Sequence, residues 1–310
     1  MLQPLTQFEI VLSIYNQEKL IERVLYGIFI NTTTPFNLIL VFDGCTDRTE
    51  KRALSYIGRY RPKILKKIII DHAPNVYETR ANNIGFKKAT EKYIITLQDD
   101  MIIDEYGWER RLTYPLRKFD DVLAVSSRTA QDIGLMEDFE SQEYFTHQAS
   151  REFGSLSRDI FAVRDTINRG PVAFNMEYLR DINYLNEDYA PSDLDDADLC
   201  LRAWKEKSLR CGAYWINYIS RLEWGKARSK DSTMYENKHI SKNAMQLKKD
   251  HIDYILSQQK HSADIPIPES EVDYIQNLSK KYIQNIFIYP IRINCKDIKR
   301  SIKNFVRYFL

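Results

Sequence analysis

The sequence lacks the motifs that usually identify metal sites, disulfide scaffolds and nucleotide-binding folds. Its four cysteines, Cys45, Cys200, Cys211 and Cys295, are scattered over 310 residues and form no CxxC pair. This argues against a cysteine zinc motif and favours free thiols in a reducing compartment over a disulfide framework. There is no GxxxxGK[ST] loop and no GxGxxG, so neither a P-loop nor a dinucleotide fingerprint accounts for the chain.

Long apolar runs and an excess of one charge are missing as well. No stretch reaches the roughly 18 consecutive apolar residues of a membrane span. The N-terminus has no basic start followed by an apolar stretch, so no signal peptide is predicted. The formal net charge is only +2, so the chain has no strong positive electrostatic field that would favour nucleic-acid binding. We therefore expect a cytoplasmic protein with a soluble catalytic part and no nucleic-acid partner.

The chain does contain an alternation of short apolar runs and amphipathic segments over residues 8–100. Strands are expected at 8–16, 38–43, 66–71 and 93–98. Helices are expected after Asn16, which is a good N-cap, over 48–60, where Asp47 and Glu50 have the spacing of a capping box, and over 78–92. This alternation predicts an α/β fold with a parallel sheet and helices on both of its faces.

The pattern changes in the second half of the chain. Residues 130–170 are polar and predict loops with short elements, whereas 194–206 predict a helix with Ala197, Leu201 and Trp204 on one face. After about residue 230 the composition shifts towards Lys, Asn, Gln, Ile and Tyr. The segment "DIPIPES", 264–270, is interpreted as a linker.

Polar residues gather where the predicted strands end. Asn16 follows the first strand, Asp43 the second, and the adjacent Asp99 and Asp100 the fourth. The carboxyl ends of parallel strands share one rim, which is where such sheets bind ligands. Asp43 alone could instead be a helix cap. A cap needs only one carboxylate, so the adjacent Asp99 and Asp100 favour a hard divalent cation that bridges a diphosphate.

The order of these motifs resembles the inverting family 2 glycosyltransferases. The resemblance rests on "LSIYN", "LILVFDGCTDRT", "NVYETRANNIGFKKATEKYIITLQDDM" and "LDDADLCLRAW", and it covers roughly residues 8–225. It implies a GT-A fold, in which a Rossmann-like, mostly parallel sheet is flanked by helices. It also implies a nucleoside-diphosphate-sugar donor, a glycan or lipid-linked acceptor, and Mn²⁺ or Mg²⁺ as cofactor.

The resemblance assigns the donor site residue by residue. Asp43 is expected to contact the nucleobase, with Tyr15 and Asn16 also in the nucleotide-sugar site. "QDD" occupies the place of the family's DXD motif, so Asp100 is the expected metal ligand and Asp99 the expected sugar or ribose contact. Gln98 departs from the pattern. Arg80 is expected near the base or diphosphate, although a solvated Arg on a helix face is the alternative.

The acceptor side is assigned in the same way. Asp196, in "DDADL", aligns with the catalytic base, and Asp195 replaces a Glu beside it. Arg169 and Gly170, in "RGPVAFN", lie where the family shapes its acceptor pocket. The alternative for the acids is electrostatic, because carboxylates are favoured at a helix N-terminus. The family's metal-side His is absent from "RLEWGKARSK", 221–230, where Glu223, Trp224, Lys226 and Arg228 are candidate substitutes.

The resemblance also sets the expected domain organisation. Residues 1–230 would form the GT-A domain, with a nucleotide-sugar half over 1–104 and an acceptor half over 105–230, followed by a helical extension over 231–310. The tail 296–310 has an apolar stripe and basic residues, so it would either lie on the inner face of an anionic membrane or dock on the catalytic domain.

Two other functions remain open at this point. The first is a GT-A module that binds nucleotide sugars or carbohydrate without catalysis, which Gln98 and the missing His would permit. The second is a nucleotidyltransferase, which uses a similar sheet and a metal. That class would be expected to carry a Gly-rich basic loop after the first strand, and "SIYNQEKLIE" is neither Gly-rich nor basic.

Overall fold

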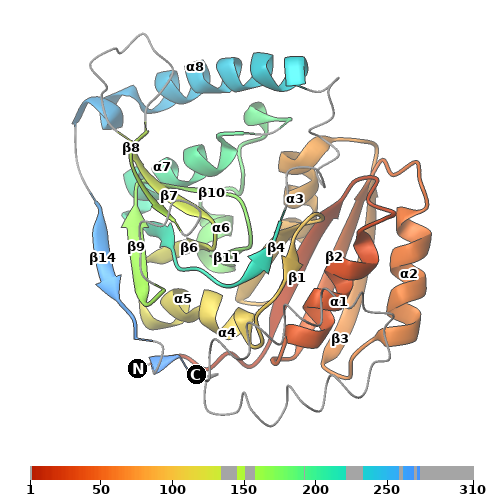
Figure 1. Cartoon of the computed structure of the whole chain (residues 1–310). Helices are drawn as coiled ribbons and strands as arrows, with labels where there is room; N and C mark the ends of the chain where they lie inside the picture. Colours follow the sequence, from red (N-terminus) through yellow and green to blue (C-terminus); the bar gives the residue numbers. More distant parts are fainter. Residues whose placement is uncertain are drawn as a thin grey trace.

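A computed structural model describes residues 2–133, 145–150, 158–191, 193–220, 233–257, 261–268 and 271–272. A nine-stranded sheet runs through the centre of the molecule (Figure 1). In spatial order its strands are β14 (Ala263–Pro266), β9 (Ile160–Arg164), β12 (Arg210–Ala213), β6 (Val122–Ser126), β11 (Val172–Asn175), β4 (Tyr93–Gln98), β1 (Phe8–Ile14), β2 (Phe36–Asp43) and β3 (Leu65–Ala73).

The half of the sheet formed by β4, β1, β2 and β3 is parallel. Its inner strands consist mainly of β-branched and aromatic residues, and every residue of β2 is buried, as expected for strands covered on both faces. In the other half, β11 runs antiparallel to β4 and β6, and β9 runs antiparallel to β12 and β14. β12 runs parallel to β6, so only β11 and β9 run against the direction of the other seven described strands of this sheet, and the sheet is mostly parallel, as predicted.

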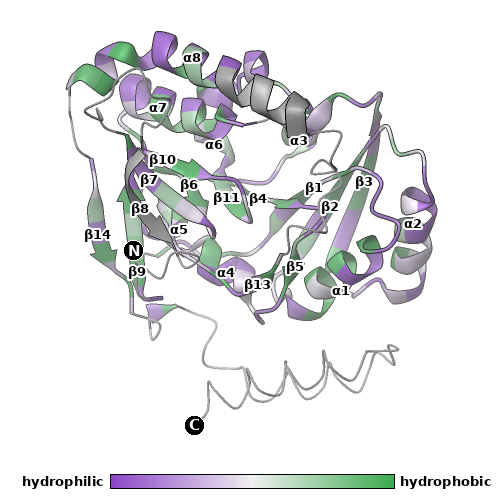
Figure 2. Cartoon of the chain, turned by 45° about the horizontal axis from the view of Figure 1, so that its top comes forward, coloured by the Kyte–Doolittle hydropathy of each residue, from purple (hydrophilic) through white to green (hydrophobic). Residues whose placement is uncertain are grey.

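Helices cover both faces of the sheet. They are α1 (Ile21–Asn31), α2 (Thr49–Tyr60), α3 (Tyr77–Lys88), α4 (Trp108–Leu112), α5 (Tyr114–Lys118), α6 (Met176–Asp181), the 3-10 helix η1 (Glu187–Tyr189), α7 (Asp195–Lys207) and α8 (Thr233–Ser257). One core joins a face of the sheet to α1, α2, α4 and α5, and a second core joins the opposite face to α3, α6 and α7. Figure 2 shows hydrophilic and hydrophobic residues mixed along α2, and the apolar Ala53, Tyr56 and Ile57 of this helix are buried.

Two smaller sheets complete the described strands. One contains β10 (Thr166–Asn168), β7 (Thr129–Ile133) and β8 (Phe145–Ser150), and the other pairs β13 (Tyr218–Ile219) with β5 (Ile102–Ile103). The short strands within 130–170 agree with the prediction of short elements there. The α/β class and the strands and helices expected over 8–100 are confirmed.

Three local predictions need correction or comment. Asn16 does not cap α1, since its side chain accepts hydrogen bonds from the loop after β2. Asp47 does accept the amide of Thr49 at the start of α2, but Glu50 pairs with His72, so the reciprocal half of the capping box is absent. The linker interpretation of 264–270 is wrong for Asp264–Pro266, which belong to β14.

Residues beyond 230 pack against elements that precede them. α8 lies along α7 (Figure 1), and β14 extends the central sheet beside β9. The division at residue 230 stays a prediction. The tail 296–310 and the segment 221–230 lie outside the described residues. Within the described ranges, no helix combines the length and apolarity needed to cross a membrane.

Two helical glycines provide a test of the packing between α3 and the sheet. A Cβ at Gly85 would overlap Cγ1 of Val11 in β1, whereas a Cβ at Gly58 in α2 would meet nothing within 4 Å. We expect Gly85→Ala to lower the free energy of unfolding by about 1–3 kcal/mol through overpacking. Gly58→Ala should raise it by about 0.4–1 kcal/mol, because alanine reduces the entropy of the unfolded chain.

Urea unfolding of the two variants beside the wild type measures this difference. Equal stabilities of the two variants would show that α3 does not approach β1 as closely as the structure indicates.

Candidate active site

The strand order reverses between β1 and β4, and the candidate site begins there. β1 leads through β2 to β3 on one side, and α3 then returns the chain to β4 on the other side of β1. The backbone N–H of Tyr15, just after β1, donates to Oδ2 of Asp99, just after β4, at 2.7 Å. Nε2 of Gln17 donates to Oδ1 of Asp99 at 3.3 Å. Asp99 therefore spans the switch point where such sheets bind ligands.

The electrostatics of Asp99 are unusual for a carboxyl group. Burial raises its pKa to about 8, and the charge of Asp100 adds to this effect, while the hydrogen bonds from Tyr15 and Gln17 oppose it. Two adjacent carboxylates at a partly covered rim are thus held close together at an electrostatic cost. A bound cation would favour the charged form of both.

Asp43 lies on the neighbouring strand of the same rim. Its Oδ1 accepts the backbone N–H of Val76 at 2.6 Å and its Oδ2 accepts that of Tyr77 at 2.8 Å. The carboxylate therefore caps the start of α3, rather than the helix that follows it in sequence. Capping does not exclude the predicted contact with a nucleobase, because each carboxylate oxygen has a further lone pair.

Asn16 joins the loops after β1 and β2. It has a φ of 50° and its Oδ1 accepts the backbone N–H of Thr46 at 2.8 Å and of Asp47 at 3.3 Å. Its role in the described structure is to fix the shape of the rim. Contact with a nucleotide sugar stays a prediction.

A second cluster, which contains the predicted acceptor residues, surrounds Arg169. Nη2 of Arg169 lies 2.6 Å from Oδ1 of Asp195, and its backbone N–H donates to Oδ2 of Asp196 at 2.8 Å. Oγ1 of Thr79 donates to Oδ2 of Asp195 at 2.8 Å. Asp195 has no exposed surface, whereas Asp196 is partly exposed. This burial suits a role for Asp195 in holding Arg169 better than the predicted contact with an acceptor.

Asp195 and Asp196 differ in exposure, but the pKa of each is raised. Burial raises the pKa of Asp196, and the positive charge and backbone N–H of Arg169 oppose the rise. Burial also raises the pKa of Asp195, again against the charge of Arg169. A carboxylate with a raised pKa is a better proton acceptor near neutral pH than an ordinary Asp.

Glu78 links the two clusters, and the sequence did not single it out. Its Oε1 accepts a hydrogen bond from Nε2 of Gln98 at 2.8 Å and lies 3.7 Å from Nη1 of Arg169. Gln98 precedes Asp99, and Arg169 contacts both Asp195 and Asp196. The paired acids after β4 and the acids at the start of α7 therefore belong to one connected polar site.

The remaining predicted residues lie around this site. Gly170 is buried, and a Cβ there would approach Cβ of Arg128 to 2.9 Å, so the glycine permits close packing of two segments. Arg80 is exposed and its Nε lies 3.6 Å from Oε2 of Glu187 in η1. In the described structure it thus faces an acidic neighbour, and contact with a base or diphosphate stays a prediction.

The donor set at Asp100 fits a cation that is shared with a substrate. Among the described residues, no group of three or more His, Cys, Asp or Glu side chains could hold a metal alone. Mg²⁺ in nucleotide sites commonly takes one or two carboxylates and completes its shell with phosphate oxygens and water. Asp100, with Asp99 beside it, matches that type of site.

One described cavity lies away from these clusters. It has a volume of about 500 Å³ and lies beside the later turns of α3 and α7, with Lys87 and Glu206 among its lining residues. The candidate site lies at the first turns of the same two helices. The cavity is therefore not part of the strand-end site.

Comparison with known proteins identifies the family. The model of "Glycosyl transferase family 2" matches residues 9–182, which is more than half of the chain. The chain belongs to glycosyl transferase family 2. This match includes the rim from Tyr15 to Asp100 and also Arg169, but it ends before α7.

Solved structures show that this family 2 chain has the GT-A fold. GalNAc-T7, crystallised with UDP, GalNAc and Mn²⁺, is 13% identical with a TM-score of 0.56, over 78% of this chain and 47% of that one. Glucosyl-3-phosphoglycerate synthase from Mycobacterium tuberculosis, crystallised with Mn²⁺, UDP and phosphoglyceric acid, is 15% identical with a TM-score of 0.50, over 84% of this chain and 87% of that one.

A curated relative extends these comparisons. The teichoic acid poly(glycerol phosphate) polymerase of Staphylococcus epidermidis is 30% identical over 117 residues. This match covers 38% of the family 2 chain and 15% of the polymerase, so the chain corresponds to a small part of that protein.

Tyr77 is a further candidate that the sequence did not reveal. It is the first residue of α3, it is 43% exposed, and it has a φ of 67°, a value that strongly favours glycine. Strained backbone of this kind clusters at functional sites. Tyr77 donates its backbone N–H to Asp43, the predicted nucleobase contact. Only the backbone conformation could have identified it.

We expect the Tyr77 ring to stack on the nucleobase of the donor. Base–aromatic stacking contributes about 1–3 kcal/mol, so Tyr77→Gly should weaken nucleoside diphosphate binding by about fivefold to a hundredfold. The same change should not destabilise the fold, because glycine adopts this φ without strain. Calorimetric titration with nucleoside diphosphates, together with thermal unfolding, measures both effects.

Tyr77→Phe is the matched control, since it keeps the ring and should bind like the wild type. If Tyr77→Gly retained full affinity, the ring would lie outside the nucleotide site.

Proposed function

We propose that this protein transfers a sugar from a nucleoside diphosphate to an acceptor hydroxyl with inversion at the anomeric carbon. The observation that carries the proposal is the connection of the two acidic clusters through Glu78 and Arg169. Binding of a nucleotide sugar alone requires the acids after β4. It does not require a second, partly exposed carboxylate that is connected to them through Glu78 and Arg169.

The chain's own groups account for a single displacement step. Asp196 accepts the proton of the acceptor hydroxyl, and the acceptor oxygen forms a bond to the anomeric carbon. The bond from that carbon to the diphosphate oxygen breaks, and the diphosphate leaves with the electron pair. The backbone N–H of Arg169 holds the Asp196 carboxylate in position. One direct displacement inverts the anomeric centre.

Asp100 would hold Mn²⁺ or Mg²⁺, and the adjacent Asp99 would contact the sugar or the ribose of the donor. Such an ion, bound with the donor, supplies Lewis-acid stabilisation for the charge that develops on the leaving diphosphate. Both GT-A structures described above were crystallised with Mn²⁺, which agrees with this proposal.

The acceptor is proposed to belong to one of three classes, which are a glycan, a lipid-linked acceptor and a polyol-phosphate polymer. The polymerase relative, whose name includes poly(glycerol phosphate), motivates the last of these. Release of nucleoside diphosphate from a panel of nucleotide sugars, with glycerol phosphate and simple sugars as acceptors, tests the reaction class. Release of pyrophosphate instead would indicate a nucleotidyltransferase.

The metal assignment predicts the behaviour of Asp100→Ala. Wild-type affinity for a nucleoside diphosphate should rise when Mn²⁺ is added, because the ion joins the diphosphate to the carboxylate. The variant should lose this dependence and its turnover should collapse, whereas Asp253→Ala, on the exposed face of α8, should match the wild type. Wild-type activity that is unaffected by EDTA would refute the metal assignment.

The base assignment predicts the behaviour of Asp196→Asn. Asparagine keeps the shape but cannot take the proton, so transfer should fall by about 10²–10⁴-fold. Affinity for nucleoside diphosphate should change little. If Asp196 only stabilised the start of the helix, activity would barely change, because Asn and Asp are similar there. Analysis of the product by NMR should show an anomer opposite to that of the donor, and retention would exclude the single displacement.

A further inference from the structure

Helix α8 holds the loop that leads into α7. Asn243 of α8 is fully buried, and its Nδ2 donates to the carbonyl oxygens of Tyr189, at 2.7 Å, and of Asp193, at 3.0 Å. One amide group thus bridges the two ends of the segment between η1 and α7. Asp195 and Asp196 follow this segment directly.

The backbone that Asn243 holds is strained. Asp193 has a φ of 72° and Leu194 a φ of 65°, so two consecutive residues other than glycine adopt the left-handed region. Each such residue costs on the order of 1 kcal/mol or more, and it persists only where its surroundings fix it. The carbonyl of Leu194 then accepts the N–H of Asp198 at 2.9 Å, which begins the hydrogen bonding of α7.

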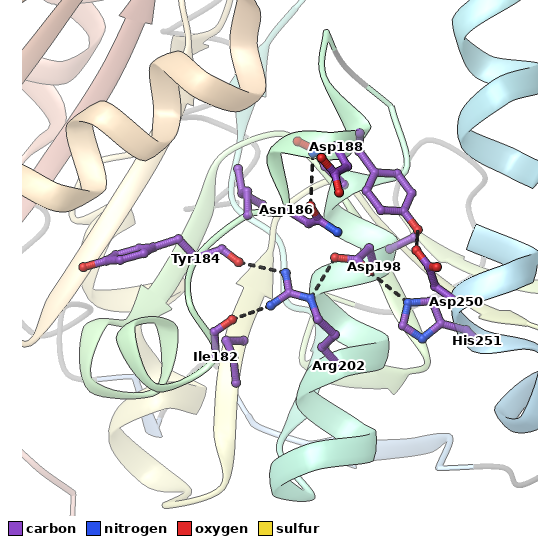
Figure 3. Close-up of polar contacts among 12 residues, drawn as sticks. Ile182, Tyr184, Asn186, Asp188, Asp198, Arg202, Asp250 and His251 are labelled. Atoms are coloured by element: carbon purple, nitrogen blue, oxygen red, sulfur yellow. Dashed lines mark hydrogen bonds and ion pairs between the residues drawn. The ribbon is translucent and has the colours of Figure 1, made fainter. Parts of the chain in front are cut away.

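A second attachment lies in the first turn of α7 itself. Nε2 of His251, at the kink in α8, lies 2.9 Å from Oδ1 of Asp198, and both side chains are buried. Figure 3 shows this pair beside Arg202, whose Nε lies 2.8 Å from Oδ2 of Asp198. The neighbouring Asp250 accepts the hydroxyl hydrogen of Tyr189 at 3.0 Å. Asp196 therefore lies between two points, Asp193 and Asp198, that are both bonded to α8.

Apolar contacts strengthen this arrangement. Ala244 and Leu247 of α8 are buried in one cluster with Ala197 and Leu201 of α7. The apolar face that the sequence predicted for α7 is thus covered by α8, and the polar attachments lie at its N-terminal end. α8 fixes both the axis of α7 and the conformation of its first turn.

We propose that Asn243 is a positioning residue for transfer, through which α8 supports the active site although it lies beyond the residues that match the family model. The proposal rests on the function proposed above, with Asp196 as base. Asn243 does not touch the reacting atoms. It acts through the carbonyls of Tyr189 and Asp193, which set where the Asp196 carboxylate stands. A displacement of about 1 Å at such a group can cost on the order of 10²-fold in rate.

The test compares three variants of the full chain. Asn243→Leu has a similar volume and no donor, and Asn243→Ser keeps one hydroxyl that can reach at most one of the two carbonyls. Met245→Ala alters the same helix at a side chain that is 69% exposed, and it is the control. For each, kcat is measured per site that binds nucleoside diphosphate with Mn²⁺, together with the Kd for that ligand and the Tm.

We expect kcat per binding site to fall on the order of 10²-fold in Asn243→Leu and about tenfold in Asn243→Ser, with the Kd unchanged. A purely structural role would lower the Tm and leave kcat per binding site equal to that of Met245→Ala, which would overturn the proposal. If the leucine variant fails to fold, kcat of the serine variant decides in the same way. Absence of transfer by the wild type would instead overturn the proposed function, and this proposal with it.

Discussion

The site depends on one largely buried charge, the guanidinium group of Arg169, whose side chain is 11% exposed. Removal of a charge from water is costly unless partners replace the solvent, and here Asp195 and Glu78 do so at 2.6 Å and 3.7 Å. Burial would lower the pKa of Arg169, but the surrounding carboxylates outweigh burial and raise it, so the group stays charged. Because Asp195 and Glu78 lie on different helices, this cation joins α7 to α3.

The site as a whole contains more acidic than basic side chains before any substrate binds. Asp99, Asp100 and Asp196 are at least partly exposed near the same rim, and a nucleoside diphosphate would add further negative charge. Burial raises the pKa of Asp99 and of Asp196, because the hydrogen bonds and charges around these groups offset only part of the cost of removing a carboxylate from water. A divalent cation that arrives with the donor is the natural complement to such a site.

The sequence allowed the central architecture to be predicted, because buried parallel strands and amphipathic helices leave periodic patterns from residue 8 to 100. It also placed Asp99 just after a strand and Asp196 at the start of a helix, whereas the roles expected for them came from the family resemblance and stay predictions. It did not locate Glu78 or Asn243, whose importance comes from contacts with residues distant in the chain. β14 was missed because Pro266 at its end and Pro268 just after it suggest a linker, although an edge strand tolerates proline.

The hydrogen bond between Gln98 and Glu78 explains why the first position of the DXD-like motif holds an amide. An aspartate at 98 would bring a second carboxylate towards Oε1 of Glu78, in place of the donor that now lies 2.8 Å away. The side chains at these two positions therefore depend on each other. In family members with an acid at position 98, the residue aligned with Glu78 should be neutral or basic, so that the pair covaries across the family.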